Sequence, residues 1–311
     1  MLRIHFAPLQ GYTNYTYRRL HHQAIGGVVS YTTPFLRYEH HEVRNKDRND
    51  ILAANNVGLP IVPQIIAADK SELRPLTDLL LKEGYTHIDI NLGCSFPLQT
   101  RQQRGAGMLP HPKKVQALLD AAKSYPEVTW SVKMRLGLDN TDECMALMPL
   151  FNDMDLDHIT LHPRIGRDGF NGRCDERAFG TFASECHHPV WWSGNADSSE
   201  MLHHLEETFP SLTDVMIGRG LLARPSLAVE YVQGTVWSIN QRIALALKIH
   251  DALYAELQLR LQGPVQLLSH MQSYWEYQSA IMPRKIYKGL MKSRDIIHYM
   301  DAIDELRKQG E

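Results

Sequence analysis

Cysteine, long apolar runs and net charge are all scarce in this sequence. The 311 residues include only four cysteines, without a C-x-x-C pair, which is typical of reduced thiols and not of a disulfide framework. No apolar run approaches the roughly 20 residues of a membrane helix, and the N-terminal MLRIHFAPLQG lacks the apolar core of a signal peptide. The net charge of −2 provides no global positive field for a polyanion. We therefore expect a cytoplasmic protein in which any polyanion site is a local patch.

Short β-branched runs alternate with segments of helical periodicity in most of the chain. The runs predict strands at Ile4–Ala7, Val28–Thr32, Ile61–Gln64, His87–Asn91, Thr129–Met134, His158–His162, Val190–Ser193 and Val215–Gly218. Apolar residues at helical spacing predict intervening helices, among them Leu73–Lys82, Lys114–Lys123 and Glu200–Glu207. This order favours an α/β fold, a (β/α)8 TIM barrel. A doubly wound sheet is the alternative, but APLQGYTN follows the first strand where that fold has G-x-G-x-x-G.

The last part of the chain carries no strand signal. A helical pattern spans Ile239–Leu261, Gly263-Pro264 interrupts it, and two further helical stretches follow. We therefore predict a barrel domain over residues 1–236 and an all-helical domain over residues 237–311, with the boundary within Gln233–Ser238.

Polar residues or glycines stand at the ends of seven of the eight predicted strands. Because the loops after the strands build the active face of such a barrel, they predict one large polar ligand across its mouth. These residues are Pro8, Leu9, Gln10, Gln64, Asn91 with Cys94, Lys133 with Arg135, His162 with Arg164, Ser193 to Asn195, and Gly218 to Gly220.

Three of these positions favour particular chemistry. The turns SGNAD and IGRG follow the last two strands, where barrels bind phosphate and where Arg219 could add a charged clamp; two tight glycine turns are the alternative. Lys133 within a central strand favours an anionic ligand, such as a reduced flavin, unless it pairs with Asp89. The strand IDINLGC presents Cys94 at its tip, as a working thiol or as a small buried apolar residue.

The histidines do not predict a metal site. Four histidine doublets occur, but none has i, i+4 spacing with a companion acid. His158 and His162 lie four apart on one strand, too distant to share a zinc ion. We expect no bound metal.

One segment near the C-terminus is strongly basic. Met282–Arg294 contains Arg284, Lys285 and Lys288 without an acidic residue, which fits an RNA-binding surface or a solvated helix face. Arg18 and Arg19 on the first helix could extend this patch.

In combination, the motifs resemble those of the tRNA-dihydrouridine synthase family. The matching runs are APLQGYTN, VPQI, INLGCSFP, GAGMLPHP, SVKMRLG, LHPRIGRDGFNGRCD and VMIGRG, in the family's order over the whole chain. The resemblance implies an FMN-containing barrel with a C-terminal helical domain that binds tRNA. It also implies reduction of the C5=C6 bond of specific uridines in tRNA, with NADPH as the reductant.

The resemblance further implies a role for each matching residue. Pro8, Leu9, Gln10 and Gln64 would lie against the flavin ring, and Lys133 and His162 would bond its polar end and the ribityl chain. Ser193 (in place of the family's Asn), Gly194, Asn195, Gly218 and Arg219 would complete the cofactor site at its phosphate end. Asn91 and Arg164 would lie near the substrate base, Cys94 would be the proton donor, and Arg284, Lys285 and Lys288 would contact RNA.

The proposed chemistry needs a thiol at position 94. A thiol of pKa about 8.5 is protonated at neutral pH and can act as a general acid, so Cys94 needs no activating base. The family usually has proline directly after this cysteine, whereas here Ser95-Phe96 precede Pro97. Two alternatives stay open: a flavin barrel that reduces a small pyrimidine-like molecule, and a catalytically weak RNA-binding paralogue. We expect a monomer.

Overall fold

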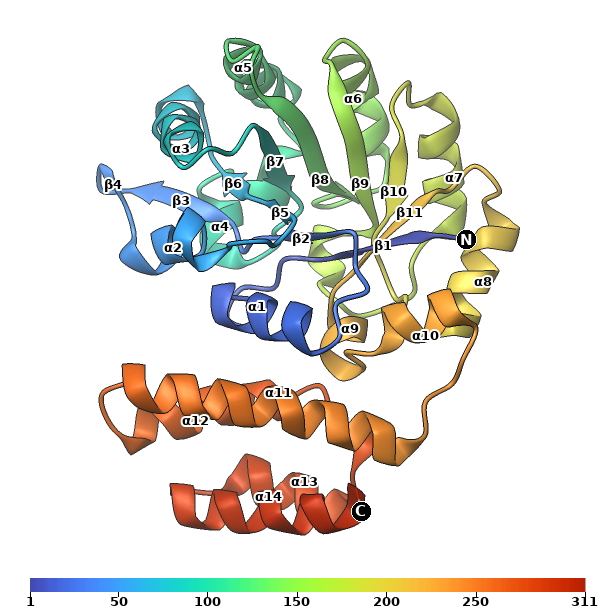
Figure 1. Cartoon of the computed structure of the whole chain (residues 1–311). Coiled ribbons are helices and arrows are strands. Elements are labelled where there is room, and N and C mark those ends of the chain that lie inside the picture. Colours follow the sequence, from blue (N-terminus) through green and yellow to red (C-terminus); the bar gives the residue numbers. More distant parts are fainter. Residues whose placement is uncertain (311) are drawn as a thin grey trace.

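In the computed structural model, which describes residues 1–310, helices surround one curled β-sheet (Figure 1). The sheet contains β1 (Arg3–Phe6), β2 (Ser30–Thr32), β3 (Leu36–Glu39), β4 (Glu42–Val43), β5 (Ile61–Val62), β6 (Gln64–Ile66), β7 (His87–Leu92), β8 (Thr129–Gly137), β9 (Leu156–Ile165), β10 (Val190–Trp192) and β11 (Asp214–Ile217). The predicted α/β class is confirmed.

The strand pairing is parallel apart from the β3–β4 hairpin, which the sequence did not predict. β1 pairs with both β11 and β2, and β2 pairs with β5. β6 pairs with β3 and β7 instead. The single strand predicted over Ile61–Gln64 is therefore divided at Pro63, which lacks a backbone N–H. The first part, β5, pairs with β2 at one end of the strand order, and the second part, β6, lies near the other end.

Helices connect the strands. They are α1 (Tyr15–Ala24), α2 (Asn45–Asn49), α3 (Lys70–Lys82), α4 (Pro97–Arg101), α5 (Pro112–Lys123), α6 (Asp142–Asn152), α7 (Glu176–Glu185), α8 (Ser199–Thr208), α9 (Arg219–Ala223) and α10 (Leu227–Gln233). Short 3-10 turns occur at Ala53–Asn55, Gly105–Met108, Gly166–Asp168 and Ser279–Ile281. The three helices predicted in this region are present as α3, α5 and α8.

The connecting helices bury their apolar stripes against the sheet. In α3, Leu73, Leu76 and Leu80 are fully buried at spacings of three and four residues. The helix begins ahead of the predicted Leu73 because Asp69 caps it, accepting a hydrogen bond from the Ser71 N–H at 2.7 Å. Apolar periodicity therefore locates such a helix but misses its polar first turn.

From Ile239 onward the elements are helical: α11 (Ile239–Arg260), α12 (Pro264–Trp275), α13 (Arg284–Lys292) and α14 (Ile296–Gly310). The prediction of two helical stretches after α11 was wrong, because three α-helices follow it. Figure 1 shows this helical part as a layer beneath α1, α9 and α10.

Buried Glu230 fixes the junction between the two parts of the chain. Its carboxylate accepts hydrogen bonds from Arg224 Nε at 2.9 Å, from Ser226 Oγ at 2.5 Å and from the Trp237 N–H at 2.6 Å. It also accepts one from Arg242 in α11 at 3.3 Å. Burial raises the pKa of Glu230, but the hydrogen bonds that its carboxylate accepts, from Arg224 first, lower this pKa to about 2. This carboxylate therefore joins α10 to the first helix of the C-terminal part.

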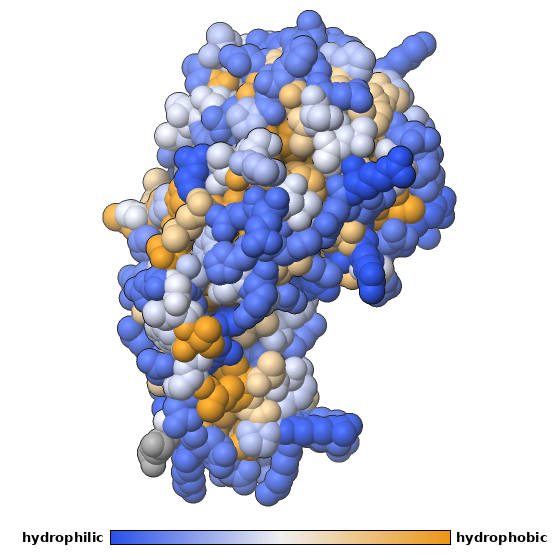
Figure 2. All heavy atoms as spheres, turned by 90° about the vertical axis from the view of Figure 1, so that its right-hand side faces the viewer, coloured by the Kyte–Doolittle hydropathy of each residue, from blue (hydrophilic) through white to orange (hydrophobic). Residues whose placement is uncertain are grey.

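None of the described helices combines the length and the apolar composition that a membrane-spanning helix needs. On the face in Figure 2 most of the surface is hydrophilic, and the hydrophobic atoms form small separate groups.

Candidate active site

Three layers of polar side chains line the inside of the sheet. Cα partners in parallel strands point to the same face, so the strand register defines each layer. The deepest layer contains Gln64, Asp89 and Ser131, and both Gln64 Nε2 and Ser131 Oγ donate to Asp89 at 2.7 Å. Asn91 and Lys133 are partners in the next layer, and Arg135 and His162 in the outermost one.

A cavity of about 460 Å³ opens above these layers, at the carboxyl ends of the strands. Its lining includes most of the site residues predicted from the sequence, namely Pro8, Leu9, Gln10, Gln64, Asn91, Cys94, Lys133, His162, Arg164, Ser193, Gly194, Gly218 and Arg219. Asn195 lines an adjoining cavity that shares Gly194 and Arg219 with the first. The structure therefore brings these positions together at one mouth.

The loop that carries Cys94 is held from below by Asn91. The Asn91 side-chain oxygen accepts hydrogen bonds from the Gly93 N–H at 3.0 Å and the Cys94 N–H at 2.8 Å, while its nitrogen donates to Gln64 at 2.8 Å. Arg135 Nε donates to the Gly93 carbonyl at 3.0 Å. Both ends of the Asn91 amide are thus used within the protein, so Asn91 positions the cysteine loop.

A second constraint on this loop comes from Gly105. Its φ of +56° suits glycine, and a Cβ at this position would approach the Cys94 carbonyl oxygen to 2.7 Å. The Ala106 N–H donates to the same carbonyl at 3.0 Å. Close packing on Cys94 therefore requires glycine at position 105, the first residue of the motif GAGM.

The environment of Cys94 favours the neutral thiol. Burial raises the pKa of Cys94, although the Phe96 N–H and Arg135 favour the thiolate. Ser95-Phe96 place an aromatic side chain, 62% exposed, at the rim before Pro97 begins α4. Ser95 and Phe96, which precede Pro97 here, thus lie at the rim, and Cys94 lines the cavity.

Lys133 is a cation without a carboxylate partner at the base of the cavity. Its Nζ donates to Ser193 Oγ at 3.1 Å, whereas Asp89 is bonded to Gln64 and Ser131. Burial, followed by Arg135, lowers the pKa of Lys133 to about 8. The alternative of a direct Lys133–Asp89 ion pair is absent from the described contacts, and the lysine is available to an anionic ligand.

His162 and Arg164 form a hydrogen-bonded pair on β9. Arg164 Nη1 donates to His162 Nε2 at 2.9 Å. Burial and the surrounding cations, Arg135 first, hold the pKa of His162 well below its ordinary value, so the imidazole is neutral. The buried Arg164 Nε has no hydrogen-bond partner among the described residues. The other nitrogens of Arg164 are used within the protein, since Arg164 Nη2 donates to the Gly172 carbonyl at 2.8 Å.

Arg219 marks the end of the cavity that was predicted to bind phosphate. Its guanidinium lies 4.4 Å from the ring centre of Phe170, and its Nη2 lies 3.4 Å from the Asn195 side-chain oxygen. A Cβ on Gly194 would come within 2.7 Å of Cys174 Sγ. Close packing of this turn on Cys174 and Trp192 therefore requires glycine at position 194.

The predicted basic RNA patch lies away from this cavity. Arg284, Lys285 and Lys288 are exposed on α13. Lys285 and Lys288 line a groove bordered by acidic residues of α14, including Asp301 and Glu305.

The suggested extension of this patch through Arg18 and Arg19 was wrong. Arg18 is 1% exposed, and its guanidinium donates to the Thr13 carbonyl at 2.8 Å, because α1 packs this face inward. Arg19 is paired with Glu256 of α11.

Sequence reasoning did not anticipate Phe170 and Tyr277, two aromatic residues of the cavity lining. Phe170 is 53% exposed and stacks near His162 with ring centres 6.2 Å apart. Tyr277 follows α12 and reaches the barrel mouth from the helical part of the chain. No local pattern reveals such a contact, because it depends on how the helical part docks.

The structure also groups His87, Asp157 and His158, with ligand atoms within 4.8 Å of one another. The sequence argument considered the four histidine doublets and His158 with His162, and it overlooked this set. A register shift between β8 and β9 at this point allows the adjacent Asp157 and His158 side chains to meet, 2.7 Å apart. His158 also stacks on Trp191 at 3.3 Å between ring centres. These contacts account for the cluster, and the expectation of no metal stays a prediction.

The model of the family Dihydrouridine synthase (Dus) matches residues 5–296 of the chain. The chain belongs to the dihydrouridine synthase family. It is 25% identical over 227 residues to tRNA-dihydrouridine synthase B of Pasteurella multocida, covering 72% of this chain and 67% of that protein. It is 26% identical over 301 residues to a probable tRNA-dihydrouridine synthase of Aquifex aeolicus, covering 94% and 89%.

Solved structures match the fold of this dihydrouridine synthase family member at low sequence identity. Morphinone reductase in complex with tetrahydroNAD aligns with a TM-score of 0.52 and 10% identity, over 76% of this chain and 88% of that chain. This likeness concerns the fold alone.

Proposed function

We propose that the protein reduces specific uridines of tRNA to dihydrouridine, with FMN as cofactor and NADPH as reductant. The observation that carries this proposal is the cavity itself, where a protonated thiol faces four cationic side chains. Lys133, Arg135, Arg164 and Arg219 line it, and its described lining contains no aspartate or glutamate. Family membership identifies the reaction class for which such a cavity is suited.

The residues present fit an FMN molecule. Lys133, whose Nζ has no carboxylate partner among the described contacts, supplies a donor for the polar atoms of a flavin. Gly194, Gly218 and the cationic Arg219 line the end of the cavity proposed for the phosphate. When bound, FMN would supply the hydride, a chemistry that belongs to the cofactor. We also propose that β5 and β6 together form one strand of a closed (β/α)8 barrel, which would present all these residues at one mouth.

Cys94 would donate the proton that completes reduction of the C5=C6 bond. Negative charge develops at C5 and O4 of the uracil ring during reduction, so a neutral acid near C5 and hydrogen-bond donors near O4 assist it. The raised pKa of Cys94 keeps the acid protonated. Asn91 and Gly105 would act indirectly by fixing the cysteine loop.

The uridine would leave the RNA stack to enter this cavity. Exposed Phe96 and Phe170 border the opening and offer aromatic faces for an unstacked base. The basic residues Arg284, Lys285 and Lys288 of α13 would contact the phosphate backbone outside it.

The decisive experiment supplies the purified protein with FMN, NADPH and undermodified tRNA, and maps dihydrouridine by sequencing. We expect a yellow protein that forms dihydrouridine at one or a few positions. NADPH-dependent reduction of free pyrimidines without any product in tRNA would support the small-molecule alternative. Tight tRNA binding without turnover, with flavin bound, would support the non-catalytic alternative.

A further inference from the structure

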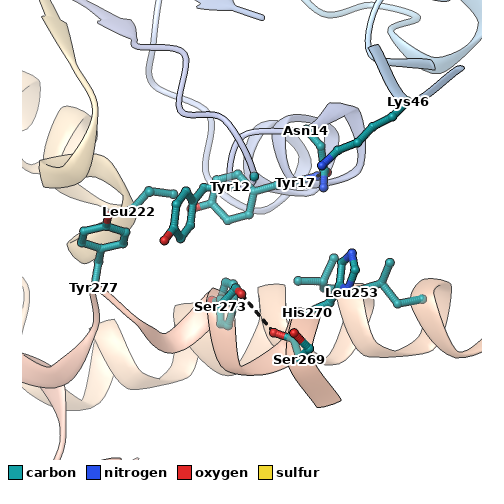
Figure 3. A pocket seen from close by; sticks show the side chains of 13 residues that line it. Tyr12, Asn14, Tyr17, Lys46, Leu222, Leu253, Ser269, His270, Ser273 and Tyr277 are labelled. Atoms are coloured by element: carbon teal, nitrogen blue, oxygen red, sulfur yellow. Dashed lines mark hydrogen bonds between the residues drawn. The ribbon is translucent and has the colours of Figure 1, made fainter. Parts of the chain in front are cut away.

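A second cavity, of about 220 Å³, lies between α1 and the helical part of the chain. In Figure 3, Tyr12, Asn14, Tyr17 and Lys46 line it from the barrel side, and Ser273 and His270 from α12. This volume is several times the roughly 30 Å³ that one water molecule occupies in the liquid. The space is large enough for a planar organic group.

Hydrogen bonds within the protein hold the two walls of this cavity together. Thr16 Oγ1 of α1 donates to Glu256 of α11 at 2.9 Å, and Lys248 Nζ donates to the Ala24 carbonyl at 3.3 Å. The hydroxyl of Tyr12, a lining residue, donates to Glu276 at 2.6 Å. The cavity is therefore formed before a ligand arrives, which lowers the entropic cost of binding.

The lining has the composition of a site for a nucleic-acid base. Tyr12, Tyr274 and Tyr277 supply aromatic faces, while His270 and Lys46 supply polar edges. No acidic residue is among the described lining residues, so the lining does not repel a phosphate group.

Tyr17 contributes its ring to the wall of the cavity. Its side chain is 4% exposed and lines the cavity, but its hydroxyl oxygen is closed off from the cavity space and has no hydrogen-bond partner among the described residues. A bound base would therefore contact the ring and not the hydroxyl.

The second cavity directly adjoins the candidate active site. Tyr12 and Tyr277 line both cavities, with ring centres 5.2 Å apart in an edge-to-face arrangement. A pair of aromatic rings therefore separates the two spaces. A strand that placed one base in the first cavity would have its next nucleotides within reach of the second.

We infer that this second cavity binds the unstacked base of a nucleotide adjacent to the target uridine and so helps to select the uridine that is reduced. The inference rests on the proposed function, because it requires an RNA substrate. Two bases held in the two cavities would fix which nucleotide of the RNA enters the active site. Contacts of α13 with the RNA backbone carry no sequence information.

Two variants test this inference in the FMN-loaded enzyme with tRNA and NADPH. His270→Ala removes a polar edge of the cavity, and Tyr17→Phe removes only a hydroxyl that the cavity does not expose. We expect His270→Ala to raise KM for tRNA about tenfold, close to the contribution of one hydrogen bond, and Tyr17→Phe to leave it unchanged. The turnover number and the rate of flavin reduction by NADPH should stay within about twofold of wild type. His187→Ala, on an exposed loop before β10, is the matched control and should leave KM unchanged.

A tRNA series separates recognition of a base from a structural effect. Abasic substitution next to the target uridine should raise KM for the wild type and have little additional effect on His270→Ala, since the two changes remove one contact. Unchanged KM for tRNA in His270→Ala, additive effects, or a rise in KM for NADPH would overturn the inference. If the wild type formed dihydrouridine while these results were obtained, the proposed function would survive; if it formed none in any tRNA, the proposed function itself would fail.

Discussion

Replacement of Cys94 by alanine tests the central element of the proposed chemistry. A positioned general acid contributes about 10²- to 10⁴-fold to a rate, so we expect Cys94→Ala to lower the turnover number by that factor. The substitution leaves Asn91, Lys133 and Arg164 in place, and FMN and tRNA affinities should change by less than about threefold. Stopped-flow mixing of pre-reduced enzyme with tRNA measures the reduction step directly. Cys186→Ala, a half-buried cysteine outside the cavity lining, is the control and should retain full activity.

The pH dependence of the same step follows from the raised pKa of Cys94. The protonated thiol is the active form, and burial raises its pKa above the ordinary value. The reduction rate should therefore stay constant through neutral pH and decline only above the pH at which a free thiol ionises, about 8.5. A rate that increased as the thiol ionised would refute the role of Cys94 as an acid. So would a Cys94→Ala enzyme within a few-fold of the wild-type rate.

Three further predictions concern residues around the cavity and at the opposite end of the sheet. Lys133→Met should weaken FMN binding at least tenfold by fluorescence titration, and wild-type affinity should decrease above pH 8, where the cation with a pKa of about 8 is lost; equal affinities would contradict the role of Lys133. Gly105→Ala should displace the Cys94 loop and reduce turnover at unchanged FMN affinity, because its Cβ would approach the Cys94 carbonyl to 2.7 Å. Asp214→Asn should destabilise the fold by about 2 kcal/mol in urea unfolding, as expected when a hydrogen-bonded carboxylate loses its charge, since Asp214 is fully buried and bonded to His5 at 2.8 Å, Arg3 at 2.7 Å and Thr213 at 2.6 Å. Its pKa is lowered to about 2, so its contribution is complete above about pH 4 and is lost as pH decreases toward 2; a variant as stable as wild type would rule it out.

The fold class and most strands could be predicted because both depend on local patterns. In Ile88 to Leu92, buried apolar residues alternate with the polar Asp89 and Asn91, and this period of two predicts a strand. Strand boundaries were less predictable. β9 extends from Leu156 to Ile165 although only His158–His162 was predicted. Leu156 and Ile165 pair with β8 beyond register shifts, and the polar Asp157 and Arg164 interrupt the apolar pattern on either side. The β3–β4 hairpin is short and partly exposed, so its sequence carries little periodicity.

Positions at the site could also be predicted, since parallel strands bring their carboxyl ends to one edge. The partners of those side chains could not. Arg18 was expected at the surface, but it is buried and donates to the Asp50 carbonyl at 2.5 Å and to Asn56 at 3.0 Å. A charged residue on a helix is usually solvated, and only the tertiary structure supplies the backbone acceptors that make its burial tolerable. The same limit applies to His87 and Asp157, which meet through a register shift that no spacing rule reveals.

The sequence predicted that Asn91 and Cys94 both act on the bound substrate, but their contacts in the structure differ. Both lie at the end of β7, and a strand-end polar residue is as suitable for binding a substrate as for holding a loop. The hydrogen bonds decide between these roles. The Asn91 amide is bonded to the N–H groups of Gly93 and Cys94 and to Gln64, so an approaching base would have to displace existing partners. The Cys94 thiol, in contrast, faces the cavity with its proton retained by burial. Asn91→Ala should therefore act through the geometry of Cys94, with a loss of turnover that exceeds any loss of tRNA affinity.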